Sequence, residues 1–296
     1  MPDTFMTHPV SPQHHPSLKH SARQRGVSLI ELMVGLAIGL LTIAVALGTL
    51  LMSRNVSSTV SDVSQLQQQA AYAFRLIGRQ LRQAGSLRLN PAVQKAPGQT
   101  LDMSDPVAFE TDYEDFKTSQ SIAGADTPSG NEFKLKVGYR NYQEPLYNAS
   151  ADASLQRNCL GEENSSSLIE SRFVFDSTNH LLKCTGTASV APKTVIDNVA
   201  KFEVRYLYQA DPTQQGSPEL QLVAASAVSD WSKVTAAEVC LVLFGNDRLE
   251  LPSSTTYTDC DGTSSVNMST LTGNRASRAH MVFRTMYQLR SQGLVS

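Results

Sequence analysis

Hydrophobic residues in the first third of the chain follow two patterns that join without a break. The segment from Leu32 to Ser53 holds 22 residues and no charge. At about 1.5 Å per residue, that length is enough to span a bilayer core of roughly 30 Å. Beyond it, apolar residues recur at steps of three or four, with Gln67 filling one gap, as in an amphipathic helix. These apolar positions are Val56, Val60, Val63, Ala70, Phe74, Ile77, Leu81 and Ala84.

No proline interrupts the chain between Val27 and Asn90. The two patterns therefore predict one helix over residues 27–86, about 90 Å long. Its first part, 27–53, is apolar all round and suited to a membrane, whereas 54–86 carries one apolar stripe for packing on a domain. We expect the helix to end near Gly85 in a left-handed cap.

The remainder of the chain, 87–296, predicts a β-rich domain. Residues 87–130 are rich in Pro, Asp, Ser and Gly and predict a long connecting loop. After it, apolar and polar residues alternate in five segments, which is typical of strands with one buried face. The apolar positions are Phe133, Leu135, Val137 and Tyr139; Phe173 and Phe175; Phe202, Val204, Tyr206 and Tyr208; Val239, Leu241 and Leu243; and Met281, Phe283, Thr285, Tyr287 and Leu289. The expected fold is α+β, with the long helix packed on an antiparallel sheet.

The junction before the apolar run differs from a secretory signal. Residues Arg23-Gln-Arg-Gly-Val-Ser-Leu-Ile-Glu31 end a basic leader at Gly26 and place one carboxylate near the start of the helix. In a secretory signal the apolar region precedes the cleavage site and is discarded, whereas here it follows. Three basic residues precede the run and Arg54 alone follows it closely, which predicts a cytoplasmic amino terminus and an exported body.

Gly26, Val27 and Glu31 resemble the processing signal of type IV prepilins. The resemblance implies that a prepilin peptidase cuts after Gly26, removes the leader 1–26 and methylates the amine of Val27. It also implies that Glu31 becomes the fifth residue of the mature chain. Val27 stands where this family usually has phenylalanine. A type IV pilin fold is the expectation that follows.

Physical reasoning gives Glu31 a role in assembly, because a carboxylate inside an apolar segment is costly and normally has a partner or a function. The new ammonium of Val27 in one subunit can neutralise Glu31 of its neighbour and set the register between them. Two unit charges 4 Å apart attract by roughly 4 kcal/mol at an effective dielectric constant of 20, before desolvation is subtracted. The alternative is a carboxylate that reaches into the headgroup region. Gly35 and Gly39 have the small-xxx-small spacing that lets membrane helices pack closely.

Composition and motifs argue against several functional classes. The formal charge is −2 at pH 7, and it becomes −4 without the leader's three basic residues and one aspartate, which gives no sign of nucleic-acid binding. Beyond residue 26 only His180 and His280 remain, and the usual protease, phosphate-binding and hydrolase motifs are missing. We therefore expect no enzyme, cofactor or metal. The acidic segments 162–164 and 259–262 lack the ligand spacing of a calcium loop, and the histidines of the leader, predicted to be disordered, are expected to be solvated.

All four cysteines, Cys159, Cys184, Cys240 and Cys260, lie in the part expected to be exported, where disulfides persist. Four cysteines allow three pairings. Proximity favours Cys159 with Cys184 and Cys240 with Cys260, each closing a loop of roughly 20 to 25 residues worth about 3 kcal/mol. These bonds would tie the 160–183 loop and the polar loop around Cys260 to the sheet. The alternative is that Cys240 is a buried free thiol.

Three segments resemble strands of PilW-type minor pilins, which are similar to pseudopilin J of type II secretion: 197–206, 231–243 and 281–290. This resemblance implies a minor pilin of the priming or tip complex of a type IV pilus, first anchored in the inner membrane by a single span. The implied partners are other minor pilins, the major pilin, the prepilin peptidase, the inner-membrane assembly platform and a large tip adhesin. The alternatives are a type II secretion pseudopilin, a single-span periplasmic binding or sensory protein and, more distantly, a cell-wall or peptide-processing enzyme.

Overall fold

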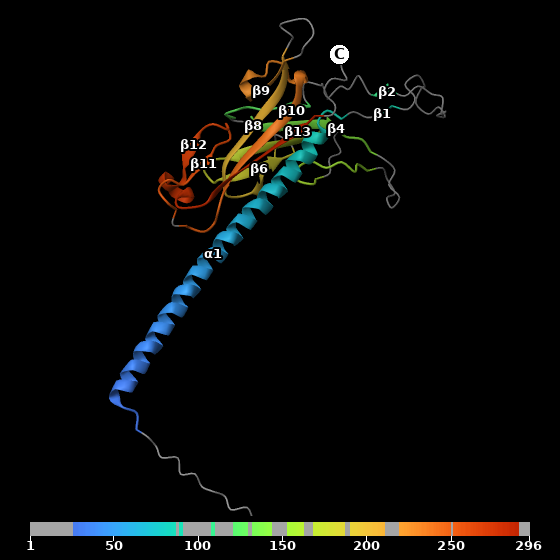
Figure 1. Cartoon of the computed structure of the whole chain (residues 1–296). Helices are drawn as coiled ribbons and strands as arrows, with labels where there is room; N and C mark the ends of the chain where they lie inside the picture. The colour runs from blue at the N-terminus through green and yellow to red at the C-terminus, as the bar shows by residue number, and fades with distance from the viewer. Residues whose placement is uncertain are drawn as a thin grey trace, which may run out of the picture. The chain divides into compact units, whose positions relative to one another are not determined.

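The computed structural model describes residues 26–86, 89–90, 108–109, 121–129, 132–143, 153–162, 168–186, 190–210, 219–249 and 251–289. The chain divides into two units, Met1–Asn55 and Val56–Ser296. One helix, α1 (Leu29–Gln83), belongs to both (Figure 1). Its limits agree with the predicted helix to within a few residues. The leader before Gly26 and most of the 87–130 segment lie outside the described residues.

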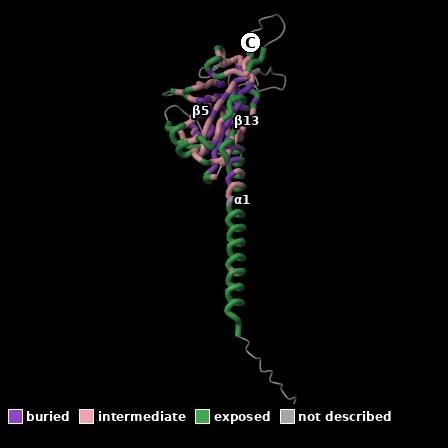
Figure 2. The backbone as a smooth tube through the Cα atoms, turned by 60° about the vertical axis from the view of Figure 1, so that its left-hand side comes forward, coloured by how far each residue is buried: buried purple, intermediate pink, exposed green. Residues whose placement is uncertain are grey.

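In the first unit, α1 is apolar on all sides and uncovered. Every large hydrophobic side chain from Leu29 to Met52 is exposed, as the continuous exposed colouring in Figure 2 shows. A helix that is apolar all round needs apolar surroundings, and this segment is long and apolar enough to cross a membrane. Two hydroxyls within it are satisfied locally, because Thr42 donates to the carbonyl oxygen of Gly39 (2.8 Å) and Thr49 to that of Ala46 (2.9 Å).

In the second unit, the larger of the two main sheets is antiparallel and has the strand order β3-β4-β5-β6-β7. Its strands are β3 (Ile122–Ala123), β4 (Leu135–Arg140), β5 (Leu168–Asp176), β6 (Leu181–Thr185) and β7 (Lys193–Ile196). The predicted alternation is confirmed in β4 and β5, where Leu135 lies opposite Phe173 and both side chains are buried.

The second main sheet has the order β13-β10-β8-β9 and is also antiparallel. Its strands are β8 (Val199–Ala210), β9 (Glu219–Val223), β10 (Val234–Phe244) and β13 (His280–Gln288). The three segments that resemble PilW strands form β8, β10 and β13, which are neighbours here. There are also two small two-stranded sheets within the described residues. One pairs β1 (Leu89–Asn90) with β2 (Ala108–Phe109), and the other is a hairpin of β11 (Thr256–Thr258) and β12 (Ser265–Asn267).

The expectation of one antiparallel sheet is therefore too simple. β7 and β8 follow each other in the chain but belong to different sheets, and the break falls at Asn198. The φ angle of Asn198 is 54°, a left-handed conformation that asparagine tolerates better than most residues and that turns the chain away from β7. Immediately after it, the amide of Val199 donates to the carbonyl of His180 (2.9 Å), which joins the two sheets at this corner.

The carboxyl-terminal half of α1 supplies one side of the core, but its buried line differs from the predicted stripe. Ala70, Ile77, Leu81 and Ala84 are buried as expected, together with Leu66 and Ala73, which the pattern did not single out. Val56 and Val60 are 57% and 64% exposed, so placing them in the packing stripe was wrong. Two adjacent stripes of the helix surface have apolar residues at steps of three and four. Which of the two stripes is buried depends on where the sheets pack against the helix.

A buried amide anchors α1 to the five-stranded sheet. Gln80 is fully buried, and its Oε1 accepts hydrogen bonds from the hydroxyls of Tyr139 (3.0 Å) and Ser171 (2.9 Å). One turn later the helix ends as predicted, with Gly85 at a φ angle of 71°. The amide of Gly85 donates to the carbonyl of Gly138 in β4 (2.9 Å). The end of the helix is thus fixed against the sheet by side chain and backbone.

Both disulfides that proximity favoured are present, Cys159–Cys184 and Cys240–Cys260. The alternative of a free thiol at Cys240 is therefore wrong. The second bond attaches the β11–β12 hairpin to β10, and a small buried cluster of Cys240, Val242 and Cys260 forms beneath it, separate from the main core. The first closes residues 160–183, within which the strand expected around Phe173 and Phe175 is present as β5 and is followed by most of β6.

Candidate processing and assembly site

The start of α1 presents the predicted cleavage site in an open position. Gly26 and Val27 precede the first helical residue and are exposed. A side chain added at Gly26 would meet no atom within 4 Å. Val27 itself is 71% exposed. The described part of the chain therefore places nothing against the Gly26–Val27 peptide bond that would keep a peptidase from reaching it.

Glu31 caps its own helix, a feature that the sequence analysis missed. Its Oε2 accepts hydrogen bonds from the backbone amide (3.1 Å) and the hydroxyl (3.2 Å) of Ser28. In return, the amide of Glu31 donates to the hydroxyl oxygen of Ser28 (3.2 Å). This reciprocal arrangement is a capping box, readable in the sequence as serine followed three residues later by glutamate. It also places the negative charge in the first turn, where the helix dipole favours it.

The capping box leaves half of the carboxylate available. Both hydrogen bonds to the carboxylate come from Ser28 and end on Oε2, and Oε1 of Glu31 accepts none within the described part of the chain. Gly35 and Gly39 follow on the same helix, and a side chain at either would have no atom within 4 Å. The structure thus holds Glu31 at the helix end and leaves both glycines without a neighbour among the described residues.

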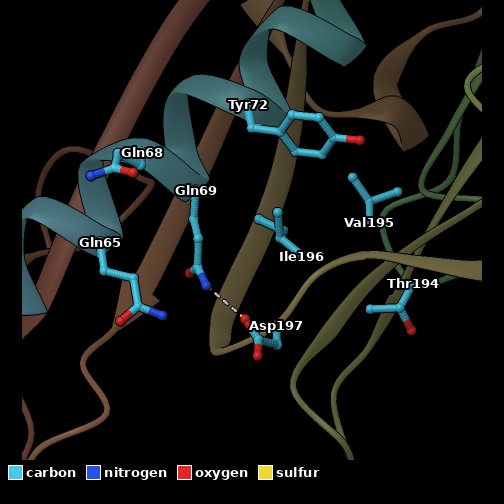
Figure 3. Close-up of a pocket in the computed structure, with 8 residues that line it drawn as sticks. All are labelled: Gln65, Gln68, Gln69, Tyr72, Thr194, Val195, Ile196 and Asp197. Atoms are coloured by element: carbon cyan, nitrogen blue, oxygen red, sulfur yellow. Dashed lines mark hydrogen bonds between the residues drawn. The ribbon is translucent and has the colours of Figure 1, made fainter.

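A groove in the second unit lies between α1 and β7 (Figure 3). Its volume is about 440 Å³, and it is lined by Gln65, Gln68, Gln69, Tyr72, Thr194, Val195, Ile196 and Asp197. Gln69 crosses it, with Nε2 donating to Oδ1 of Asp197 (2.7 Å). Amides and one exposed tyrosine dominate the helical wall, so the groove suits polar contacts more than an apolar ligand.

The acidic side chains of Glu162 and of residues 259–262 form ion pairs and hydrogen bonds within the chain. Glu162 pairs with Lys193 (2.7 Å), and Asp259 with Lys201 (2.8 Å). Asp261 accepts from the hydroxyl of Ser264 and from the amides of Thr263 and Ser264, and these bonds hold the pKa of its carboxyl well below the usual range. Among the described residues no three His, Cys, Asp or Glu side chains gather as metal ligands would.

His280 is a buried structural residue. Its ring stacks on that of Tyr257, with centroids 5.4 Å apart, and packs against Phe244 at 5.8 Å. Nδ1 lies 2.9 Å from the carbonyl oxygen of Arg278, and Nε2 accepts from Nε of Arg275 (3.2 Å). Burial is the main reason that the pKa of His280 falls to about 4, and the two nearby arginines lower it further.

The family comparison bears on the amino-terminal site. A model described as the prokaryotic N-terminal methylation motif matches residues 21–52, which include Gly26, Val27 and Glu31. The amino-terminal segment of the chain therefore carries this motif, and the match covers no residue beyond 52. A solved type IV-like pilin, TTHA1219 from Thermus thermophilus, aligns with 77% of this chain and 96% of its own length, at 12% identity and a TM-score of 0.36. No curated protein matches.

Proposed function

We propose that this protein belongs to the type IV pilin superfamily and is a minor pilin, made as a precursor and built into the priming or tip complex of a type IV pilus. The observation that carries the proposal is the order of features within 26–52: an exposed glycine, a capped glutamate and then a helix that is apolar on every side. The match to the methylation motif over 21–52 supports prepilin-type processing. Prepilin peptidase would cut after Gly26 and methylate Val27.

The capping box suggests how Glu31 takes part in assembly. Cleavage places an ammonium on Val27, next to Ser28, whose groups already hold Oε2 of Glu31. Oε1 remains to receive the amine of a neighbouring subunit. At 4 Å and an effective dielectric constant of 20, that attraction is roughly 4 kcal/mol before desolvation. Glu31 would thus stabilise the start of its own helix through Oε2 and set the register of the neighbouring subunit through Oε1.

The rest of the layout follows from this role. Residues 27–53 would anchor the protein in the inner membrane with its amino terminus in the cytoplasm, and later enter the filament core. Gly35 and Gly39 would allow close approach of other pilin helices there. Residues 54–86 would carry the exported domain, 87–296, whose two disulfides suit an oxidising compartment.

The proposed partners are other minor pilins, the major pilin, the prepilin peptidase, the inner-membrane assembly platform and a large tip adhesin. A type II secretion pseudopilin is the second candidate, because the methylation motif and the helix would serve it equally well. A periplasmic binding or sensory protein has no use for a glycine at 26 followed by a glutamate at 31.

Replacing Glu31 in the sole copy of the gene tests the assembly role. Glu31→Leu should still insert and be cleaved, because it removes a polar cost, but the protein should be missing from sheared pili. Ser28→Ala is the matched control, since it removes the cap and keeps the carboxylate. It should weaken the helix end by about 1 kcal/mol and leave incorporation intact. Normal piliation with Glu31→Leu would count against the intersubunit pairing. So would an equal loss of incorporation into pili with Glu31→Leu and Ser28→Ala.

A further inference from the structure

Three arginines form a row on the uncovered face of α1 in the second unit. Arg75, Arg79 and Arg82 are spaced by four and three residues, which places them on one side of a helix. All three are exposed. These three residues form the arginine row. Its charges lie within about 10 Å along the helix axis, on a protein whose formal net charge is −2.

Among the residues that the structure describes, the arginine row lacks the carboxylate partners that other basic residues of this unit have. Five lysines, for example, form ion pairs: Lys134–Glu203 (2.8 Å), Lys136–Glu170 (3.1 Å), Lys183–Asp176 (2.6 Å), Lys193–Glu162 (2.7 Å) and Lys201–Asp259 (2.8 Å). No ion pair links the arginine row to a carboxylate of the described residues. Within the described residues, Arg82 is the member of the row that makes a ring contact, 5.8 Å from the centroid of Tyr287. Like charges three and four residues apart destabilise a helix slightly, and no carboxylate of the described residues neutralises the row.

The groove beside β7 adjoins this row. Tyr72, which lines the groove and is 53% exposed, precedes Arg75 and Arg79 by three and seven residues and so shares their side of the helix. Figure 3 shows Tyr72, Gln65, Gln68 and Gln69 along the helical wall. Tyrosine and arginine are the residues that most often carry binding energy in protein interfaces. Amide, phenol and guanidinium groups thus form one polar surface with a positive end.

We propose that the arginine row and the adjoining groove bind an acidic segment of a partner protein, with its carboxylates on the row and its neutral polar residues along the groove. Charge complementarity sets the sign of the partner. A phosphate polymer fits less well, because Asp197 places a carboxylate in the groove wall and the row offers only three charges. The surface belongs to the second unit, so the proposal does not depend on cleavage at Gly26.

Photo-cross-linking in the producing cells tests this surface. A photoreactive residue at Ala71, which is exposed one helical turn before Arg75, should capture a partner peptide that carries at least two aspartates or glutamates. The same probe at Ser177, in the exposed turn after β5, is the positional control and should not capture it. Neutralising the row to glutamine at all three positions should reduce the cross-link by roughly tenfold or more. Replacing all three with lysine should preserve it.

Two further variants separate charge from folding. Arg248→Gln removes an exposed positive charge elsewhere in the unit and should leave the yield unchanged. Reversing the captured carboxylates to arginine should abolish the cross-link to the native row and restore it to a row reversed to glutamate. The proposal is overturned by an absent cross-link, a captured peptide without carboxylates, or equal yield from the glutamine row. It is also overturned if the variant with three lysines loses the cross-link. Cross-linking of the probe at Ala71 to nucleic acid, to lipid or to the acidic stretch 102–115 of the same chain would overturn it as well.

Discussion

Lowering the pH should destabilise the second unit of the structure through His280, the residue that packs between Tyr257 and Phe244. Its folded pKa is about 4, compared with an ordinary value of 6.5. Because the folded pKa is the lower one, the unfolded chain takes up the proton first as pH falls. The stability that His280 contributes is complete above pH 6.5 and is lost as pH falls from 6.5 to 4. At about 1.4 kcal/mol per pKa unit, the loss at pH 4.5 is about 2.5 kcal/mol.

The surroundings of the His280 ring explain why its protonation is unfavourable in the folded state. Nε2 already accepts from Arg275 and Nδ1 faces the carbonyl of Arg278, so the neutral ring is satisfied. A proton added to Nε2 would remove that acceptor and face a guanidinium group. The neighbouring titratable group, Tyr257, has a pKa raised mainly by burial and stays neutral throughout this range. Met268 covers the backbone, with its sulfur accepting from the amide of His280 (3.3 Å).

The assay is urea unfolding of the mature protein in detergent at pH 7.5 and 4.5. The single tryptophan, Trp231, reports on it because its ring packs edge-on against buried Tyr206, with centroids 4.8 Å apart. The wild type should lose about 2.5 kcal/mol more than His280→Gln between the two pH values. His180→Asn keeps His280 and serves as control. An equal pH dependence of wild type and His280→Gln would refute the reasoning.

Two further substitutions test the packing. Gly78→Ala should lower the free energy of unfolding by about 1 to 3 kcal/mol, because its new carbon would overlap the ring of Tyr287. Gly48→Ala is the control, since its new carbon would have no atom within 4 Å, and it should leave urea unfolding of the domain unchanged. Similar unfolding free energies for the two variants would contradict the close approach of Gly78 and Tyr287. Replacing Cys240 and Cys260 together with alanine should lower the unfolding free energy by about 3 kcal/mol, and limited proteolysis should then cut first in the β11–β12 hairpin. Unchanged proteolysis would show that the hairpin holds without the bond.

Local signals in the sequence predicted much of this fold. The absence of proline and the apolar spacing gave the helix, and Gly85 marked its end because a left-handed residue there favours glycine. The alternation identified β4, β8, β10 and β13, although β10 is buried on both faces, with Cys240 and Val242 in the small second cluster. Both disulfide pairs followed from proximity in the chain. In each case the information lies within a few residues or a short loop.

What the sequence did not predict depends on contacts between distant segments. The choice of Leu66 and Ala73 over Val56 and Val60 follows from where the sheets lie against α1. Gln80 reads as a polar surface residue until Tyr139 and Ser171 meet it from the five-stranded sheet. At the candidate site the opposite holds, because the Ser28–Glu31 capping box is a local signal and was readable but overlooked.

The most direct test of the central claim is the amino-terminal peptide of the protein recovered from the membrane fraction. Mass spectrometry should show a chain that begins at Val27 and carries one methyl group on its amine. Gly26→Val should leave the leader attached and give a larger precursor in the same fraction. A native chain that begins at any other residue, or an unchanged terminus in Gly26→Val, would contradict prepilin-type processing of this protein.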